Sequence, residues 1–260
     1  MLGRHRKAVS VATVGALSTA LLATAFVYDG TPATDVDLNE GGVWVTNSSL
    51  SLVGRLNFSS QVLDGAIRTL SPQIDVLQRA STVILADRGS SVSNPIDVAA
   101  MALAGESSLP TDGEVFLGAD TVAVTAEQGR LVFVMPAQNY NGFDASTAEP
   151  VLELDGPAAV TVGTDGTVYA AEPGSGLLWR VEGDKEPTST DLDIDSADTD
   201  LAITAVGDKP VVLNRARGEL VLPSGDAVDV DDASNIALQQ PSAASDAVVF
   251  ATSTELVTLP

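Results

Sequence analysis

An apolar run of three residues recurs six times along this chain, at intervals of about 40 residues. The first residues of consecutive runs are 40, 39, 46, 43 and 37 positions apart. A unit of this length cannot bury its own apolar face, so neighbouring units must share a core. The six runs are Val43–Val45, Val83–Leu85, Val122–Val124, Val168–Ala170, Val211–Leu213 and Val248–Phe250.

The most legible unit is Ala158–Asp195. An Asp165-Gly166 step separates its first two apolar runs, and a two-residue hairpin needs the positive φ that glycine adopts freely at its tip. Leu177–Val181 follows a Pro-Gly-Ser-Gly turn and is rich in the large and β-branched residues that suit a strand. With Leu192–Ile194 as the fourth strand, the unit predicts a four-stranded meander, which is one propeller blade.

We take the recurring run as the second strand of each unit. The other expected strands recur at similar distances before and after it. First strands are expected at Val36–Leu38, Ile74–Leu77, Val115–Leu117, Val160–Val162, Ile203–Val206 and Ile236–Leu238. Third strands are expected at Leu52–Leu56, Leu131–Val134, Leu177–Val181, Leu220–Leu222 and Leu256–Leu259, with only a broken Val92–Val98 run in the second unit. Fourth strands are expected at Val62–Ile67, Val98–Leu103, Val151–Leu154, Leu192–Ile194 and Ala227–Val230.

The predicted fold is therefore an all-β propeller of about six four-stranded blades. The sixth blade is incomplete, because the chain stops after its third strand; Val36–Leu38 or sequence beyond residue 260 would supply the fourth. A β-sandwich or tandem sandwiches remain the main alternative, followed by other all-β folds. A sandwich also consists of short strands, but it has no reason to repeat at a fixed interval of about 40 residues.

Residues 1–28 differ in composition from the rest. Arg4 and Lys7 lie in a basic flank that precedes Ala8–Tyr28, a run of 21 residues without charge. A basic flank followed by an apolar run is typical of an export signal. Ala23-Thr24-Ala25 favours cleavage, whereas the length, close to the roughly 20 residues that span a bilayer, equally permits an uncleaved anchor. A buried helix of the globular domain is the third alternative.

The domain prediction is thus one hydrophobic N-terminal helix at 1–28 (signal peptide or signal anchor), a linker at 29–34 and a propeller-like domain at 35–260. The expected location is the extracellular face of the cell membrane or the medium. The net charge of −22 argues against nucleic acid and against anionic membrane surfaces as partners.

The residues that most often carry chemistry are scarce. The chain has no cysteine, and its one histidine, His5, lies in the export flank. The domain therefore lacks the usual ligands of zinc, copper and haem and the usual general base. Phosphate-loop and dinucleotide motifs are absent as well. We predict no catalytic residue, no cofactor and no metal site.

Two acidic runs offer oxygen ligands that calcium prefers. They are Asp191–Asp200 and Asp226–Asp232, and neither has the glycine and the terminal glutamate of a calcium-binding loop. We therefore expect them to be a solvated strand and its loops. A glycosidase needs two carboxylates about 5 to 10 Å apart, but nothing in the sequence singles out one pair.

The aromatic residues divide into two groups. Trp44 and Tyr169 occupy the same place in their units, within the apolar second strand, and are expected to pack in the core. Tyr140, Asn141 and Phe143 instead lie in the long connection Pro136–Pro150. Because long loops often carry binding residues, these three form the candidate binding surface.

Residues 41–57, GGVWVTNSSLSLVGRLN, and blades such as GTVYAAEPGSGLLWRV at 166–181 carry a resemblance. Together with the export segment, they resemble the N-terminal propeller-like region of large envelope proteins from high-GC Gram-positive bacteria. In that family, fibronectin type III or immunoglobulin-like modules follow. The resemblance covers essentially the whole chain, with Gly42–Asn57 as its most distinctive part. It implies an N-terminal portion of a longer protein and brings no catalytic residue with it.

Two functions remain open at this point. The first is an exported, non-enzymatic module of the cell envelope that binds or scaffolds an extracellular protein or polysaccharide. The second is part of a fibronectin-associated polysaccharide hydrolase, which draws only on analogy. Two carboxylates that converge in one deep pocket would favour the hydrolase.

Overall fold

The computed structural model describes residues 42–194, 198–222, 224–241 and 247–259 of the 260-residue chain. Glu40–Pro260 forms one compact unit. The expected N-terminal helix, the linker and the first-strand candidate Val36–Leu38 lie outside the described residues. The described part contains 23 strands and three short 3₁₀ helices, so the domain is all-β as predicted.

The strands form six antiparallel sheets, each built from consecutive strands. The first sheet consists of β1 (Gly42–Asn47), β2 (Leu52–Asn57) and β3 (Val62–Arg68). The second consists of β4 (Ile74–Arg79), β5 (Thr82–Asp87), β6 (Val92–Asp97), β7 (Ala102–Leu103) and β8 (Ser107–Ser108). The third consists of β9 (Val115–Gly118), β10 (Thr121–Ala126), β11 (Leu131–Pro136) and β12 (Leu152–Glu153).

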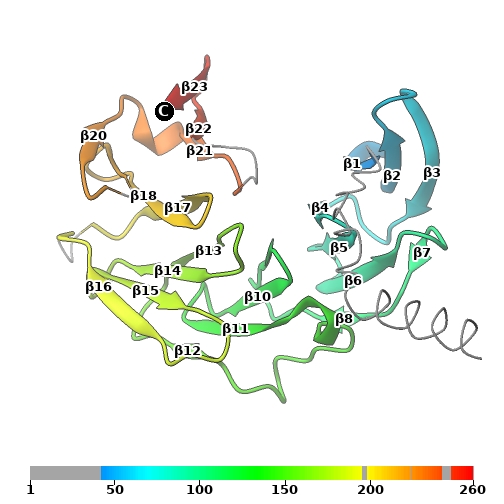
Figure 1. Cartoon of the computed structure of the whole chain (residues 1–260), viewed down its shortest axis with the longest axis horizontal. Helices are drawn as coiled ribbons and strands as arrows, with labels where there is room; N and C mark the ends of the chain where they lie inside the picture. Colours follow the sequence, from blue (N-terminus) through cyan, green and yellow to red (C-terminus); the bar gives the residue numbers. More distant parts are fainter. Residues whose placement is uncertain (1–41, 195–197, 223, 242–246, 260) are drawn as a thin grey trace, which may run out of the picture. The chain divides into compact units, whose positions relative to one another are not determined.

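The remaining three sheets repeat this plan. The fourth consists of β13 (Ala159–Val162), β14 (Val168–Glu172), β15 (Leu177–Val181) and β16 (Thr188–Asp191). The fifth consists of β17 (Leu201–Val206), β18 (Lys209–Asn214), β19 (Glu219–Val221) and β20 (Ala227–Asp229). The sixth consists of β21 (Ala237–Leu238), β22 (Val248–Ala251) and β23 (Leu256–Leu259). Figure 1 shows the strands of each sheet in neighbouring colours, as expected for a meander.

Consecutive sheets contact each other through their first strands and their apolar faces. From the second sheet to the sixth, the first strands β4, β9, β13, β17 and β21 are neighbours in that order, and β1 lies next to β4. Apolar clusters join the first sheet to the second, the second to the third, the third to the fourth and the fifth to the sixth. This face-to-face packing of successive meanders is propeller-like, and it supplies the shared core that the repeat requires.

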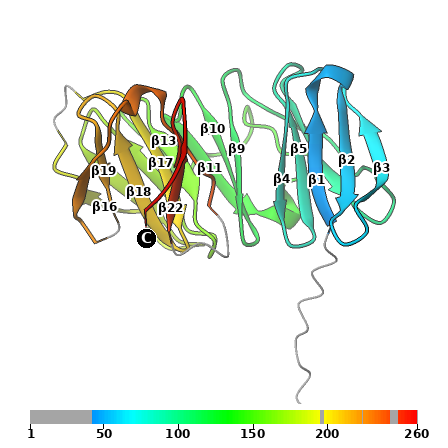
Figure 2. The same cartoon turned by 90° about the horizontal axis from the view of Figure 1, so that it is seen from above.

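The recurring apolar run is the second strand of five sheets, namely β5, β10, β14, β18 and β22. In the first sheet it lies in β1, which is the first strand among the described residues; Figure 2 shows β1, β2 and β3 side by side. Trp44 and Tyr169 are 5% and 4% exposed, so their expected packing role is confirmed. The sixth sheet has three strands among the described residues.

Two of the expected fourth strands are wrong. In the fourth sheet the outer strand is β16, which ends at Asp191 before the predicted Leu192–Ile194 begins. All four of its residues are exposed, so no apolar alternation marks it in the sequence. In the second sheet the predicted Val98–Leu103 is mostly a turn, and the short strands β7 and β8 both pair with β6.

The hairpin between β13 and β14 is longer than the predicted two-residue loop. The Gly163 N–H donates to the Thr167 carbonyl at 2.8 Å, and the Gly166 N–H donates to the Gly163 carbonyl at 3.0 Å. Gly166 has φ +88°, so the turn is followed by a left-handed residue, as in a three-residue hairpin loop. The Asp165 carboxylate accepts from the Thr167 N–H at 2.9 Å. The predicted positive φ of Gly166 is thus confirmed within a different loop.

A second repeated signal lies at the turn that follows the recurring apolar run, and it was not among the sequence-based expectations. Asn47, Asp87 and Asn214 each end the strand that contains the run and accept a hydrogen bond from the N–H of the residue three positions later, at 3.2, 3.2 and 3.1 Å. Glu172 has the same place and accepts from the Ser175 hydroxyl at 2.6 Å. In all four turns the residue just before the next strand is left-handed. A polar acceptor followed four residues later by Ser or Gly marks these turns.

Candidate binding surface

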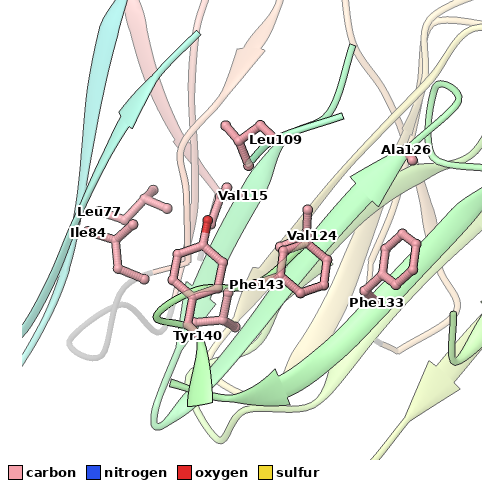
Figure 3. Packing of buried hydrophobic residues seen from close by; sticks show 10 residues of the cluster. Leu77, Ile84, Leu109, Val115, Val124, Ala126, Phe133, Tyr140 and Phe143 are labelled. Atoms are coloured by element: carbon pink, nitrogen blue, oxygen red, sulfur yellow. The ribbon is translucent and has the colours of Figure 1, made fainter. Parts of the chain in front are cut away.

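The predicted surface at Tyr140, Asn141 and Phe143 is largely interior. Tyr140 is fully buried and Phe143 is 9% exposed, so neither ring forms an exposed platform and that part of the prediction is wrong. Only Asn141 is exposed. Figure 3 shows both rings within the apolar cluster between the second and third sheets, near Ile84 and Val124.

The connection carries these rings inward because it is held to the second sheet. Ser107, in β8, donates its hydroxyl to the Tyr140 carbonyl at 2.5 Å and accepts from the Phe143 N–H at 3.3 Å. The Phe143 ring meets Phe133 edge to face, with centroids 5.4 Å apart, and stacks on Tyr140 at 6.2 Å. Both geometries are favourable for aromatic pairs. The loop therefore completes the core and does not present a ligand platform.

Burial raises the pKa of the Tyr140 hydroxyl to about 12, and the neighbouring Ser93 side chain offsets part of this rise. The hydroxyl has no partner in hydrogen-bonding geometry among the described groups. Burial raises the pKa of Tyr169 as well.

Alkaline pH should therefore destabilise the protein. The folded chain keeps the Tyr140 proton up to about pH 12, whereas an unfolded tyrosine loses it above about pH 10, so stability is complete below pH 10 and falls as the pH rises towards 12. We expect the urea midpoint to drop between about pH 9 and about pH 11, and to drop less in Tyr140→Phe. Equal drops in the parent and the variant would contradict this role of Tyr140.

The first acidic run binds arginine side chains of the fifth sheet. Asp198 contacts Arg217 at 2.5 Å and accepts from the Asn214 side-chain amide at 3.0 Å. Asp200 pairs with Arg215 at 3.1 Å. No group of three or more Asp, Glu, His or Cys side chains converges among the residues that the structure describes. Each pair keeps at least one side chain exposed to water by 40% or more, and pairs near the surface contribute little to stability, about 0–1 kcal/mol.

We expect thermal melts in chelator and in millimolar calcium to superimpose, apart from a small screening effect. The carboxylates of Asp198 and Asp200 already have arginine partners, which lowers their value as calcium ligands. Differential scanning calorimetry would measure this. A large rise in melting temperature that is specific to calcium and absent with magnesium would show a structural calcium site.

A small pocket of about 70 Å³, partly open to solvent, lies among first strands of the third to sixth sheets. Its lining combines apolar side chains such as Phe116 and Ile203 with hydroxyl and amide groups, and Thr204 donates its hydroxyl to the Gln239 carbonyl at 2.5 Å. The described residues that line it are uncharged. The pocket therefore lacks a lining carboxylate that could act as a general acid or base.

The first sheet has one apolar face that is exposed. Strand pairing places Val43 opposite Leu56 and Leu56 opposite Leu63, so these side chains share one face. Val43, Val45 and Leu63 are 45%, 40% and 54% exposed. We call this surface the free face of the first sheet and define it as Val43, Val45, Leu52, Leu56, Leu63 and Ala66.

The opposite face of this sheet is covered in part, although Val62 on that face is 53% exposed. Trp44 and Val53, on the opposite face, are 5% and 0% exposed and pack against the second sheet. The six side chains that define the free face are apolar. Arg68 pairs with Leu52 at the end of this face, and the exposed Asp64 lies in β3 between Leu63 and Gly65, where the pairing with β2 shifts register. An apolar face of this kind is typical of an interaction site.

This surface cannot be recognised from the sequence, because the run Val43-Trp44-Val45 is apolar on both faces. A strand that is covered on both sides has the same composition. Only the positions of the neighbouring sheets distinguish a covered strand from a half-covered one.

In the part of the chain that the structure describes, no helix is both long and apolar enough to cross a membrane.

The chain matches no family model, and no curated protein sequence matches it. Solved structures are similar to it in fold. Selenomethionine-substituted virginiamycin B lyase from Staphylococcus aureus is 15% identical, with a TM-score of 0.56 over 85% of this chain and 77% of the lyase. Kluyveromyces lactis Hsv2p is 9% identical, with a TM-score of 0.58 over 82% of this chain and 73% of its own.

A third similar structure is the complex of KlAtg21 with the coiled coil of AgAtg16, at 10% identity and a TM-score of 0.57, over 81% of this chain and 73% of the other. Identities this low carry the fold and nothing further. The similar structures include a lyase and a protein in complex with a coiled coil, so this fold accommodates both enzymes and binding proteins. The chain has a β-propeller-like fold.

Proposed function

We propose that this chain is an exported, non-enzymatic binding module of the cell envelope, and that it binds a protein through the free face of the first sheet. The observation that carries the proposal is the partial exposure of Val43, Val45 and Leu63 on one face of the first sheet. Apolar surface removed from water contributes about 25 cal/mol per Å². Covering these three side chains would contribute on the order of 1 kcal/mol each.

A protein partner fits this surface better than a polysaccharide does. Sugars are held by exposed aromatic rings together with convergent polar groups. The six residues of the free face are aliphatic, while the sheet's one tryptophan, Trp44, is buried on the other side. Aliphatic anchors surrounded by polar residues are the pattern of protein interfaces.

A photo-crosslinking amino acid at position 45 tests the proposal in cells that make the protein natively. We expect a crosslinked product of defined mass from position 45. Val151 provides a matched control, because it is the same residue type, is also 40% exposed and lies outside the free face. Loss of the product on Val43→Asp would tie it to this face. No product from position 45, or the same product from position 151, would refute the proposed binding surface.

Export and location form a separate part of the proposal. They rest on the basic flank and the uncharged run Ala8–Tyr28. Protease added to intact cells should digest the propeller while a cytoplasmic marker survives. Protection of the propeller until the cells are lysed would contradict an extracellular location.

The non-enzymatic part is tested by assaying the purified chain for release of reducing ends from cell-wall polysaccharides. We expect no turnover above the buffer rate. Turnover that one Asp→Asn or Glu→Gln substitution abolishes would instead establish the glycosidase alternative.

A further inference from the structure

The turn that carries the two buried rings of the long connection also contains the one Asn-Gly step of the chain, Asn141-Gly142. Tyr140 and Phe143, on either side of this step, are 0% and 9% exposed. Asn141 and Gly142 are both exposed to solvent. A pair of exposed residues is thus held between two core residues, so a chemical change in the pair would act directly on the core.

Gly142 leaves its backbone nitrogen accessible. It has φ +78°, and a Cβ built on it would meet no atom within 4 Å, so this side of the residue faces open space. Neither the Gly142 N–H nor the Asn141 side-chain amide has a hydrogen-bond partner among the described groups. Any other residue at position 142 would also shield the nitrogen with its side chain, which glycine lacks.

Asn139 lies in the same connection and offers the opposite arrangement. It is exposed, but the residue after it is Tyr140, whose ring shields the backbone nitrogen. The Tyr140 N–H also donates to the Ala137 carbonyl at 3.2 Å, so this nitrogen is bound as well as shielded. The two asparagines therefore differ in the group that follows them and not in their exposure to water.

We infer that Asn141 is a site of spontaneous deamidation in the folded protein, and that the reaction loosens the contact between the second and third sheets. The Gly142 nitrogen forms a bond to the Asn141 Cγ, the bond from Cγ to Nδ2 breaks, and Nδ2 leaves as ammonia with the proton of the Gly142 N–H. The product is a cyclic succinimide. The inference does not depend on the binding surface proposed for the first sheet.

Water then opens the succinimide ring in one of two ways. Cleavage of the newly formed bond between the Gly142 nitrogen and Cγ gives aspartate. Cleavage of the original peptide bond gives isoaspartate, in which the main chain runs through the former side chain. In both cases the water oxygen stays on the carbonyl carbon and a proton returns to the nitrogen, so water is the only co-reactant.

Isoaspartate would disturb the core because it lengthens the backbone between two buried rings by one methylene group. The turn is closed by the Phe143 N–H, which donates to the Tyr140 carbonyl at 3.1 Å, and the Ser107 hydroxyl binds both residues. The Phe143 ring stacks on Tyr140 in the cluster between the second and third sheets (Figure 3). Close-packed interiors tolerate little displacement, so the added group should lower stability.

The first test follows the amide groups of the purified full chain during weeks of incubation at mildly alkaline pH. Peptide mass spectrometry should show acid in place of the amide at position 141, while the amide of Asn139 persists. Methylation by protein isoaspartate methyltransferase would report the isoaspartate product. An amide that persists at position 141 in buffer and is lost only in urea would overturn the inference, because the folded turn would then block the reaction.

The second test measures how the reaction affects stability. The fraction that contains isoaspartate should melt roughly 2–12 °C below the fresh parent. Fresh Asn141→Asp has the added charge with a normal backbone, so it should melt with the fresh parent, as expected for an exposed site. Asn141→Ala cannot deamidate at this position and should keep its melting temperature during incubation.

Two outcomes of the second test would overturn the coupling to the core. The first is an isoaspartate fraction that melts with the fresh parent, which would show that the turn absorbs the added methylene group. The second is an equal loss of stability in the parent and in incubated Asn141→Ala, which would place the damage elsewhere in the chain.

Discussion

Replacing Gly166 by valine is expected to lower the melting temperature of this protein by roughly 6–12 °C. Gly166 has φ +88°, a conformation that costs a β-branched residue about 1–3 kcal/mol. A Cβ at this position would also lie 2.6 Å from the Thr121 hydroxyl oxygen and 3.3 Å from its Cβ, so the third sheet would have to move. A total of about 3 kcal/mol corresponds to that shift for a domain of this size.

Gly174→Val is the matched control for this substitution. Gly174 lies in the next turn of the same sheet, its φ is not positive, and a Cβ there meets no atom within 4 Å. Calorimetry should show a change of about 2 °C or less for the control, as expected for a surface site. If the two variants melt together, the left-handed residue at Gly166 does not hold the hairpin between β13 and β14.

Truncating Tyr140 to alanine should lower the free energy of unfolding by about 3–5 kcal/mol. The side chain is fully buried, and its removal would leave a cavity beside Phe143, which stacks on it. A loss of this size lowers the melting temperature by roughly 6–20 °C. The experiment also tests the core role of a ring that the sequence predicts to be a surface group.

Tyr140→Phe removes only the hydroxyl and keeps the ring, so it measures the contribution of the hydroxyl to stability separately from that of ring packing. The hydroxyl is buried without a hydrogen-bond partner among the described groups, so its removal should leave stability unchanged or raise it. Exposed Asn141 supplies the neighbouring control, and Asn141→Ala should change stability by less than about 0.5 kcal/mol. A parent-like melt for Tyr140→Ala would contradict the core role, and a large loss for Tyr140→Phe would reveal a bond to the hydroxyl.

The all-β class and the positions of most strands could be predicted from the sequence. Second strands such as β10 and β14 are buried on both faces, so they appear as continuous apolar runs that a period of about 40 residues makes unmistakable. The positive φ of Gly166 was predictable because it depends only on the residues of one tight turn, in which glycine adopts this conformation freely. These features depend on contacts that every unit repeats.

Outer strands were less predictable because their residues lie at the edge of a sheet. The strand β16 is exposed at every position, so its sequence, Thr188 to Asp191, is that of a polar loop. It is a strand because its backbone pairs with β15. This pairing uses main-chain groups, so it does not require apolar side chains and cannot be recognised from the sequence.

The candidate binding surface could hardly be predicted from the sequence, because tertiary structure determines which side chains are exposed. Tyr140 and Phe143 look like surface aromatics in a long polar connection, and they are core residues because Ser107 of another sheet binds that loop. Val43 and Val45 have the composition of core residues and remain exposed because no sheet within the described ranges covers them. The sequence by itself determined the repeat, the strand class and the turns, since these arise within one unit. Tertiary structure alone decided which apolar face stays exposed, because a sheet face is buried only where another sheet packs against it.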